Sequence, residues 1–355
     1  MKDIKKLVMT GVLMMSMTAP VFASETKVPT IGEATGETSV QVHVTKDLEF
    51  AEGLAIPDTT VSFNIQKVTP DAPEATIGAI TFSAADAKGN AANNKYTVSK
   101  NAEIQFGTFT HAGEYEYDIS EVKGDFAGMT YSTDHYRIRV QVANKAKGGL
   151  YIKTVTAEKN TTNGTAENKA AAIKFTNTYR KNASLEVEKK TEGDLADKTK
   201  KFGFTITLEK SSTETTDAPV YTGKIGDQTV SVTAGTPTSF QLADGEKLVF
   251  ESLPAGTKYT VTETGVKDGY TPSVTVVANG TQRPSVSAKD EQSLASSEHG
   301  DFVGENANKV TYVNTYNEVP VTGIIMNNLP FIMMAGIAVV AFGALLIVKK
   351  HAHNQ

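Results

Sequence analysis

Two sets of three polar residues in this chain have the types and the spacing needed to form an amide bond between side chains. Each set holds a lysine, a glutamate and an asparagine, and the sets are Lys46, Glu121, Asn177 and Lys189, Glu263, Asn314. The glutamate follows the lysine by 75 residues in the first set and by 74 in the second. The asparagine follows the glutamate by 56 and 51 residues. The repeated spacing indicates one arrangement that occurs twice.

Burial would give these residues a reactivity that they lack in water. Loss of hydration lowers the pKa of a lysine and raises the pKa of a carboxylic acid. A buried Lys46 or Lys189 would then be a neutral amine and therefore a nucleophile. A buried, protonated Glu121 or Glu263 would polarise the asparagine carbonyl and carry protons as ammonia leaves. The sharpest interpretation is a spontaneous amide bond between the lysine and asparagine side chains.

Two plainer interpretations of the same residues stay open at this point. In the first, the lysine and the glutamate form a buried ion pair whose hydrogen bonds are completed by the amide. In the second, the three groups lie at strand ends, where a strand face reaches solvent and charged residues are ordinarily found. Neither interpretation involves a covalent bond.

The elements that must position these residues are β-strands. Apolar residues recur at every second position around each lysine, glutamate and asparagine, which is typical of half-buried strands. The last strand of each half carries its asparagine on the apolar face, where an amide is costly without partners. The residues that share this face are Ile173, Phe175, Asn177 and Tyr179 in the first half, and Val310, Tyr312, Asn314 and Tyr316 in the second.

An internal duplication organises the chain. Three strings recur in the same order: Val-x-Lys, Tyr-x-(Ile/Val)-(Ser/Thr)-Glu and aromatic-x-Asn-Thr-Tyr. Short alternating strands separated by turns predict an all-β chain with an antiparallel sandwich in each half. The predicted ranges are 39–180 for the N-terminal domain and 181–317 for the C-terminal domain. The polar stretch 24–38 before them is expected to be a flexible leader.

Both ends of the chain carry targeting patterns. Lys2, Lys5 and Lys6 precede the apolar run 7–17, and the small residue Ala23 follows, so residues 1–23 are predicted to be a secretory signal peptide. Residues 324–348 form an apolar span whose continuous apolar run from Leu329 is long enough to cross a bilayer. The basic tail 349–355 would stay inside the cell.

Composition narrows the classes of function. The net charge is −5 with acids and bases interspersed, so the chain has no nucleic-acid footprint. The six histidines show no metal-ligand spacing, and no phosphate loop or nucleophile motif is present. We therefore expect no metal, no cofactor and no enzyme activity beyond an autocatalytic bond. The chain has no cysteine, so an exported protein of this kind needs a stabilising device other than disulfides.

The two modules, their recurring strings and the C-terminal tail resemble the backbone (major) pilins of Gram-positive bacteria, most of all the two-domain streptococcal T-antigen type. The resemblance implies tandem immunoglobulin-like, Cna-B-like domains, each with one Lys–Asn isopeptide bond and a catalytic glutamate. Lys190 competes with Lys189 for the second bond, but its side chain should point away from the face of Val187. The implied bonds are Lys46–Asn177 with Glu121, and Lys189–Asn314 with Glu263.

The segment before the apolar span resembles a sortase sorting signal of the Leu-Pro-x-Thr-Gly type. It reads Val319-Pro320-Val321-Thr322-Gly323, with valine in place of leucine, which leaves the class of the recognising sortase open. The resemblance implies cleavage between Thr322 and Gly323 and transfer of Thr322 to a lysine of the next subunit. Such a head-to-tail contact does not close on itself, so it generates a filament. A plain transmembrane anchor is the alternative.

The resemblance places the acceptor lysine just before the last strand of the first domain. Lys169 is the first candidate, followed by Lys159 and Lys174. The implied partners are a class C-type pilus sortase, a housekeeping sortase, identical subunits in a covalent polymer, ancillary pilins at the tip or base, and a host surface. The implied location is a pilus on the cell surface, anchored to the cell wall after secretion.

A monomeric wall-anchored adhesin is the closest rival function. It would use the same Cna-B-type modules as a stalk and present a ligand-binding domain at the tip. Both modules of this sequence are accounted for as sandwiches, so no third module remains for ligand binding. The sequence therefore favours the structural subunit.

Overall fold

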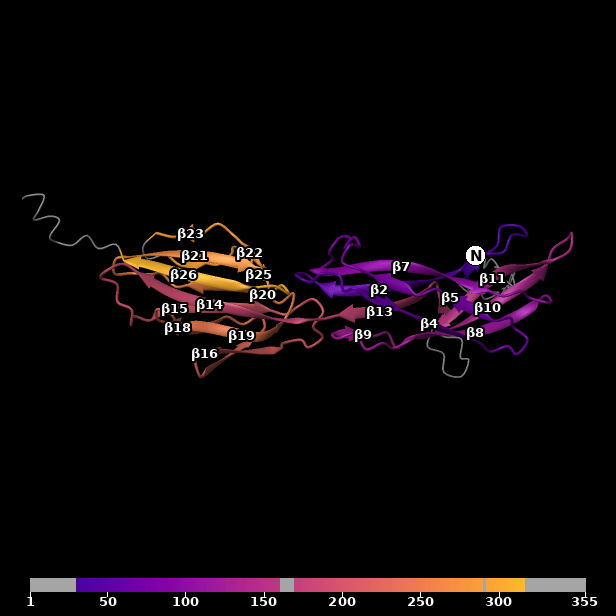
Figure 1. Ribbon diagram of the computed structural model, residues 1–355, viewed down its shortest axis with the longest axis horizontal. Coiled ribbons are helices and arrows are strands. Elements are labelled where there is room, and N and C mark those ends of the chain that lie inside the picture. The colour runs from indigo at the N-terminus through magenta and orange to yellow at the C-terminus, as the bar shows by residue number, and fades with distance from the viewer. Residues whose placement is uncertain (1–29, 160–168, 290–291, 317–355) are drawn as a thin grey trace, which may run out of the picture.

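The computed structural model describes residues 30–159, 169–289 and 292–316, and these form two β-sandwiches that lie end to end (Figure 1). The described residues contain strands, turns and bends but no helix, which confirms the predicted all-β class. No helix in this part of the chain is therefore long and apolar enough to cross a membrane. The predicted signal peptide, apolar span and sorting motif lie outside the described residues.

The N-terminal sandwich has two main sheets. One has the strand order β1-β11-β10-β8-β4 with β12 paired to β11, and the other has the order β5-β7-β2-β13-β9; β3 and β6 pair separately. The strands are β1 (Thr30–Glu33), β2 (His43–Ala51), β3 (Thr59–Val61), β4 (Phe63–Lys67), β5 (Ala75–Ile77), β6 (Ile80–Phe82), β7 (Lys95–Phe106), β8 (Gly113–Glu121), β9 (Met129–Thr130), β10 (His135–Asn144), β11 (Leu150–Lys159), β12 (Lys169–Ala170) and β13 (Ile173–Tyr179).

The C-terminal sandwich repeats this plan. Its larger sheet has the order β17-β16-β19-β14-β26-β21-β22 with β23 on β21, and its smaller sheet has the order β18-β15-β20-β24 with β25 on β20. The strands are β14 (Asn182–Glu192), β15 (Phe202–Glu209), β16 (Val220–Ile225), β17 (Gln228–Thr233), β18 (Thr238–Leu242), β19 (Lys247–Pro254), β20 (Lys258–Glu263), β21 (Tyr270–Ala278), β22 (Thr281–Gln282), β23 (Val286–Ser287), β24 (Leu294–Ala295), β25 (Asp301–Phe302) and β26 (Lys309–Tyr316).

The core of each sandwich is formed by the alternate side chains of the facing sheets. In the first domain, Tyr117 and Ile119 of β8 pack in one cluster with Val44 of β2 and Phe175 of β13. All four side chains are buried. Burying one such side chain contributes about 1.5–3 kcal/mol. The period-2 pattern therefore fixes which face of each strand turns inward.

The first and last long strands of each domain are neighbours, and they run parallel. β13 pairs with β2, and β26 pairs with β14, while every other strand pair among the described residues is antiparallel. The predicted antiparallel sandwiches thus contain one parallel pair each. A parallel pair needs a long crossover connection, and here the rest of the domain supplies it.

The predicted flexible leader is wrong in part, because Thr30–Glu33 form β1. This strand pairs antiparallel with β11, and the N–H of Ala34 donates to the carbonyl of Lys153 at 2.8 Å. The edge of β11 would otherwise present unpaired backbone groups, which β1 satisfies. Alternation did not reveal the strand, because Ile31 is its only large apolar residue and packs against the core.

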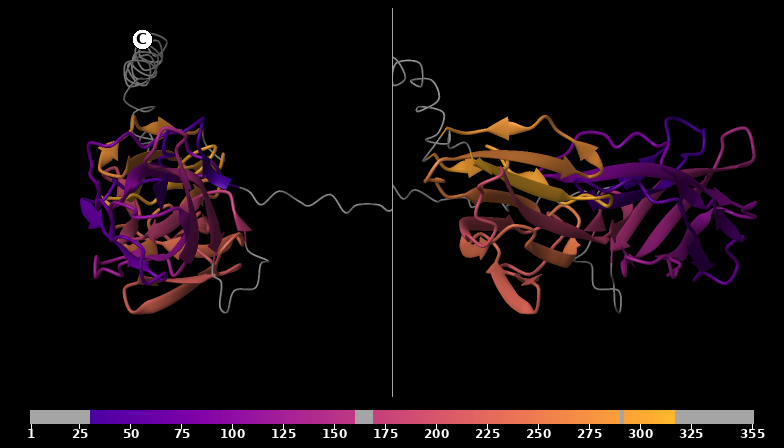
Figure 2. Two further views of the ribbon diagram at one scale, coloured as in Figure 1. Left: turned by 90° about the vertical axis from the view of Figure 1, so that its right-hand side faces the viewer. Right: turned by 60° about the vertical axis from the view of Figure 1, so that its left-hand side comes forward.

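Along the chain, only Arg180 and Lys181 separate β13 of the first domain from β14 of the second. The carbonyl of Gly53 in the first domain accepts hydrogen bonds from the N–H of Glu305 at 3.1 Å and from Nδ2 of Asn279 at 3.3 Å. Lys181 lies 3.3 Å from the Glu305 carboxylate. In the end-on view of Figure 2 the two domains overlap, so the described chain has the shape of a rod.

Candidate functional site

The lysine and the asparagine of each set lie on adjacent parallel strands in the same register. Lys46 of β2 is opposite Phe175 of β13, which lies two residues before Asn177. Lys189 of β14 is opposite Tyr312 of β26, again two residues before the asparagine. Residues two apart on a strand share a face, so the lysine and the asparagine are diagonal neighbours on one face of the sheet.

The glutamate of each set comes from the opposite sheet. Glu121 is the last residue of β8, and Glu263 is the last residue of β20. These strands belong to the sheets that face β2–β13 and β14–β26. Each glutamate therefore reaches the lysine and the asparagine across the interior of the sandwich.

In the first domain the carboxylate of Glu121 bridges the other two side chains. Lys46 Nζ lies 2.7 Å from Oε2, and Nδ2 of Asn177 donates to Oε1 at 2.5 Å. The side chains of Lys46 and Glu121 are both 0% exposed. The asparagine Oδ1 accepts a hydrogen bond from the main-chain N–H of Ser132 at 2.8 Å. Each polar group of this site thus has a partner.

In the second domain the contacts are looser. Lys189 Nζ lies 3.2 Å from Oε1 of Glu263, and Nδ2 of Asn314 donates to the same oxygen at 2.9 Å. All three residues are 0% exposed. Among the described residues, Lys189 Nζ, Glu263 Oε2 and Asn314 Oδ1 have no hydrogen-bond partner. Lys189 Nζ also lies 4.5 Å from the ring centroid of Phe202.

Aromatic rings close off both sites. Phe175, beside Asn177, has ring centroids 5.5 Å from Phe63 and 5.2 Å from Tyr136. In the second domain, Tyr312 and Phe204 have centroids 5.2 Å apart. These rings exclude water and lower the local dielectric, which raises the free energy of any charge held there.

Burial shifts both lysines, and the acid of the second site, toward their neutral forms. Burial lowers the pKa of Lys46, although the hydrogen bond and charge of Glu121 oppose the shift. Burial also lowers the pKa of Lys189 to about 8 and raises the pKa of Glu263, against the effect of each on the other. A neutral amine, a proton-carrying acid and a carboxamide in contact are the groups needed for amide exchange.

The two adjacent lysines of β14 have opposite orientations. Lys189 is the one that contacts Glu263, whereas the Lys190 side chain is 50% exposed and its Nζ lies 3.9 Å from Glu188. This placement follows from strand alternation.

The three acceptor candidates lie near one another in sequence but differ in their contacts. Lys169 is exposed in β12, opposite Glu158 of β11. Lys159 pairs with Asp134 at 2.8 Å, and Lys174 pairs with Asp47 at 2.6 Å. Residues Val319, Pro320, Val321, Thr322 and Gly323 lie outside the described residues. Within the described ranges, no three His, Cys, Asp or Glu side chains are grouped so that they could hold a metal ion.

Sequence reasoning missed two polar features of the interior. The main-chain N–H of Ser132, between β9 and β10, contacts Asn177, and a backbone group in an irregular segment leaves no mark in the pattern of side chains. The buried Asp301 of β25 pairs with Arg283, and the sequence analysis singled out neither residue.

Family models match both domains. Residues 38–180 match the Spy0128-like isopeptide containing domain, and residues 183–316 match a domain of unknown function, DUF7601. A pilin of Streptococcus pyogenes serotype M1 is 28% identical over 376 residues, which cover 98% of this chain and 98% of that protein. The pilus tip adhesin Cpa of Streptococcus pyogenes is 39% identical over 124 residues, which are 34% of this chain and 17% of the adhesin.

Solved structures of Streptococcus pyogenes major pilins are also similar. The T3.2 pilin is 25% identical with a TM-score of 0.37, and the match covers 79% of this chain and 99% of that one. The T-13 pilin is 22% identical with a TM-score of 0.36, covering 80% and 100%. The identification rests on the sequence match that extends over nearly all of both chains and on the N-terminal family model. Over nearly its whole length the chain is therefore similar to a streptococcal pilin, and its N-terminal domain matches the Spy0128-like isopeptide containing domain.

Proposed function

We propose that the chain is the shaft subunit of a cell-surface pilus, with an intramolecular Lys–Asn isopeptide bond in each domain and a sortase-made bond between subunits. The observation that carries the proposal is the buried Lys–Glu–Asn arrangement, which recurs in both domains with the same strand register. Chance would not place the same three groups between the first strand, the last strand and the facing sheet twice.

The reaction at the first site needs only the three side chains. The neutral Nζ of Lys46 attacks Cγ of Asn177, so that the Nζ–Cγ bond forms and the Cγ–Nδ2 bond breaks. Glu121 takes a proton from the amine on one oxygen and returns a proton to Nδ2, which leaves as ammonia. Oε2 of Glu121 lies against Nζ of Lys46 and Oε1 lies against Nδ2 of Asn177, so each nitrogen has its own carboxyl oxygen, as this transfer requires. Lys189, Glu263 and Asn314 would react in the same way.

The positions of the bonds suit a subunit that bears tension. Each bond would join the first and last long strands of its domain, which enter and leave the sandwich side by side. A pull on the two ends would then be carried by covalent bonds and not by a ladder of hydrogen bonds. Closing a loop of about 130 residues also restricts the unfolded state by roughly 5 kcal/mol in the chain-entropy model.

Lys169 is the acceptor that we favour for the bond between subunits. It is exposed and lies in β12, just before β13. Lys159 and Lys174 are both engaged by carboxylates, Asp134 and Asp47, which a sortase would have to displace. A class C-type pilus sortase would join Thr322 to this lysine, and a housekeeping sortase would attach the finished fibre to the cell wall.

One observation favours a second candidate function. The stretch shared with the pilus tip adhesin Cpa shows that modules of this kind also occur in an adhesin. A monomeric wall-anchored adhesin is therefore the alternative, whereas in the shaft proposal such a protein would be an ancillary partner at the tip.

Expression of the chain with its pilus sortase in a Gram-positive host without pili tests the proposal. The shaft account predicts a ladder of covalent multimers in cell-wall extracts, which disappears in Thr322→Ala and in Lys169→Arg. Lys190→Arg is the matched control and should keep the ladder. A single anchored band from the unaltered chain would support the adhesin. If the ladder is lost in Lys159→Arg or in Lys174→Arg but kept in Lys169→Arg, the acceptor is that other lysine and not Lys169.

A further inference from the structure

The two Lys–Glu–Asn sites differ at the oxygen of the reacting amide. In the first domain, Oδ1 of Asn177 accepts the main-chain N–H of Ser132 at 2.8 Å. In the second domain, Oδ1 of Asn314 has no hydrogen-bond partner among the described residues, although the residue is 0% exposed. Both sites hold a lysine, a glutamate and an asparagine, so the donor to the amide oxygen is a feature of the first site that the second site lacks among the described residues.

The orientation of the Asn177 amide follows from its neighbours. A main-chain N–H can only donate, so the atom that faces Ser132 must be the carbonyl oxygen. The other end of the amide, Nδ2, then faces Oε1 of Glu121 at 2.5 Å. The carbonyl oxygen and the leaving nitrogen are thus held by different groups, with the glutamate placed for proton transfer alone.

We propose that the Ser132 main-chain N–H is an oxyanion donor for isopeptide formation in the first domain. The inference rests on the proposed bond between Lys46 and Asn177. When Nζ attacks Cγ, negative charge develops on Oδ1, and a donor already in place stabilises this charge without reorganisation. When the Cγ–Nδ2 bond breaks and ammonia leaves, the electron pair on Oδ1 re-forms the C=O double bond and the negative charge on Oδ1 is lost. The hydrogen bond remains in the product, because Oδ1 is kept in the new amide.

The second domain must handle the same charge differently. Asn314 Oδ1 has no fixed donor, but Oε2 of the buried Glu263 has no hydrogen-bond partner either. Burial favours the protonated form of this acid, and that proton is available to the oxyanion. The first domain is therefore expected to depend on position 132 and the second domain is not.

Proline at position 132 removes the N–H and nothing else from the hydrogen-bond network of Asn177, because proline has no main-chain donor. Ser132→Ala is the matched control, since it keeps the N–H and removes only the hydroxyl, which accepts from the N–H of Asp134 at 3.2 Å. Residues 24–322 of each variant would be made by cell-free synthesis, denatured at timed intervals and digested. Mass spectrometry then gives the cross-linked fraction of the Lys46–Asn177 and Lys189–Asn314 peptides separately.

We expect Ser132→Pro to slow bond formation in the first domain on the order of 100-fold, the loss seen when one oxyanion donor is removed. The second domain should react at the unaltered rate, and Ser132→Ala should match the original chain in both domains. An unchanged first-domain rate in Ser132→Pro overturns the inference while leaving the proposed function intact. Absence of both bonds in the original chain overturns the proposed function and this inference with it.

A second measurement decides the case in which Ser132→Pro fails to fold. In Lys46→Met, which cannot react and keeps the volume of the side chain, amide hydrogen exchange reports the Ser132 N–H directly. We expect this amide to be strongly protected relative to that of the exposed Thr133. An unprotected Ser132 amide would show that the donor is not in place before reaction and would overturn the inference.

Discussion

At the scale of single residues, the chemistry of this chain follows from burial. Lys46 and Lys189 are fully buried, and a buried ammonium is costly even beside a carboxylate. Each lysine faces a glutamate and an asparagine, and reaction with the asparagine would remove the positive charge of the lysine. An amide bond converts the amine permanently to a neutral group. The same burial that makes the unreacted pair unfavourable thus makes its reaction favourable.

The burial of Lys189 leads to a pH prediction for a chain that cannot react. In Asn314→Ala the lysine keeps its lowered pKa, about 8 against an ordinary value of 10.5. Between these values the unfolded chain binds more protons than the folded one, so the free energy of unfolding of the second domain should rise with pH from 8 to 10.5. The slope is at most about 1.4 kcal/mol per pH unit. Urea unfolding at several pH values measures it.

The control for this experiment is the double variant Lys189→Met, Asn314→Ala, in which the lysine contribution is absent. Glu263 affects the free energy of unfolding in a lower pH range, because its folded-state pKa is raised above 4.5. Its stabilisation is present below 4.5 and is lost as the pH rises through the folded value. Equal alkaline slopes in the single and double variants would contradict the account of Lys189.

At the scale of elements, the alternation of apolar residues in the sequence predicted the buried face of each strand but not which strands pair with each other. It indicated which face of each strand is buried, and so placed Lys189 inward and Lys190 outward, as the structure has them. It could not indicate that the first and last strands are parallel neighbours, because pairing depends on the whole domain. It also could not reveal β1 or the Ser132 N–H, because neither a short edge strand nor a backbone donor requires alternating apolar side chains.

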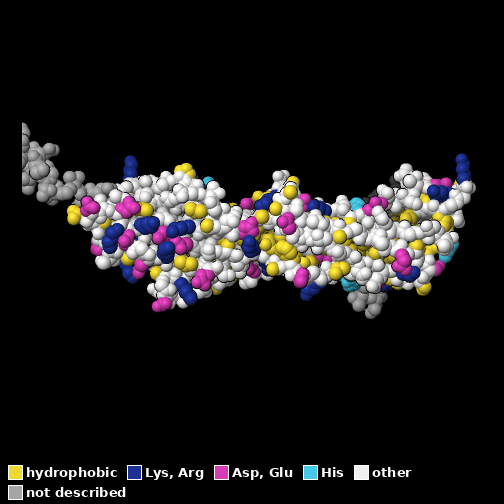
Figure 3. Space-filling view, viewed as in Figure 1, with side chains coloured by type: hydrophobic (Ala, Val, Ile, Leu, Met, Phe, Trp, Pro, Cys, Tyr) yellow, Lys and Arg dark blue, Asp and Glu magenta, His cyan; other side chains and the backbone are white. Residues whose placement is uncertain are grey.

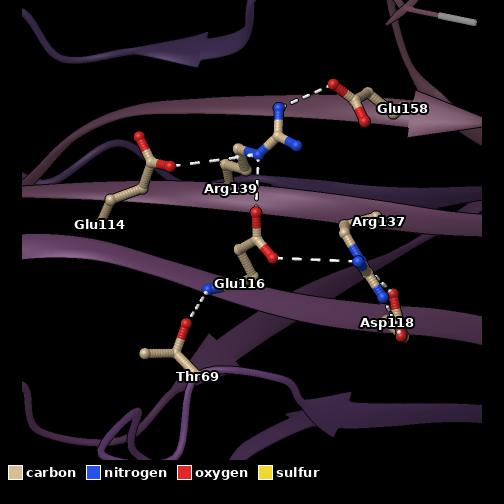
Figure 4. Close-up of polar contacts among 7 residues, drawn as sticks. All are labelled: Thr69, Glu114, Glu116, Asp118, Arg137, Arg139 and Glu158. Carbon is tan, nitrogen blue, oxygen red and sulfur yellow. Dashed lines mark hydrogen bonds and ion pairs between the residues drawn. The ribbon is translucent and has the colours of Figure 1, made fainter. Parts of the chain in front are cut away.

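The outer face of the first domain carries a ladder of ion pairs across β8, β10 and β11 (Figure 4). Arg139 is central to it, with Glu116 and Glu158 each at 2.7 Å. The Glu158 side chain is only 8% exposed, so it depends on this arginine more than an exposed acid would. The neighbouring Arg137 pairs with Asp118, whose side chain is 46% exposed.

Arg139→Met is therefore expected to destabilise the first domain by about 1–3 kcal/mol, because Glu158 is left buried without its charged partner. Arg137→Met is the matched control and should cost less than about 1 kcal/mol, as expected for an ion pair whose acid is exposed. Urea unfolding of both variants gives the two values. Equal losses would show that the burial of Glu158 does not decide the strength of the ladder.

At the scale of the whole molecule, the described chain is a rod with a short junction. On the face drawn in Figure 3, basic and acidic side chains are interspersed, and no large field of one sign is present on it. The junction relies on close backbone contact: Gly53 has φ +86°, and a Cβ there would lie 2.9 Å from Cα of Gly304. A side chain at this point cannot be accommodated without separating the domains.

Gly53→Ala is expected to loosen the junction without affecting either of the proposed isopeptide bonds. Trypsin should then cut faster after Arg180 or Lys181, the two residues between the domains. Gly245→Ala is the control, because Gly245 has a similar φ of +77° but no atom within 4 Å of the added Cβ. Cleavage that is no faster in Gly53→Ala than in Gly245→Ala would show that backbone contact at Gly53 does not hold the domains together.

The intact mass of recombinant residues 24–322 tests the central claim most directly. Each isopeptide bond releases one ammonia, so two bonds predict a mass about 34 Da below that of the sequence. The deficit should halve to about 17 Da in Glu121→Ala and in Glu263→Ala, and it should vanish when both are changed. A mass equal to that of the sequence would contradict the account, and the Lys–Glu–Asn sets would then be buried polar partners without a covalent bond.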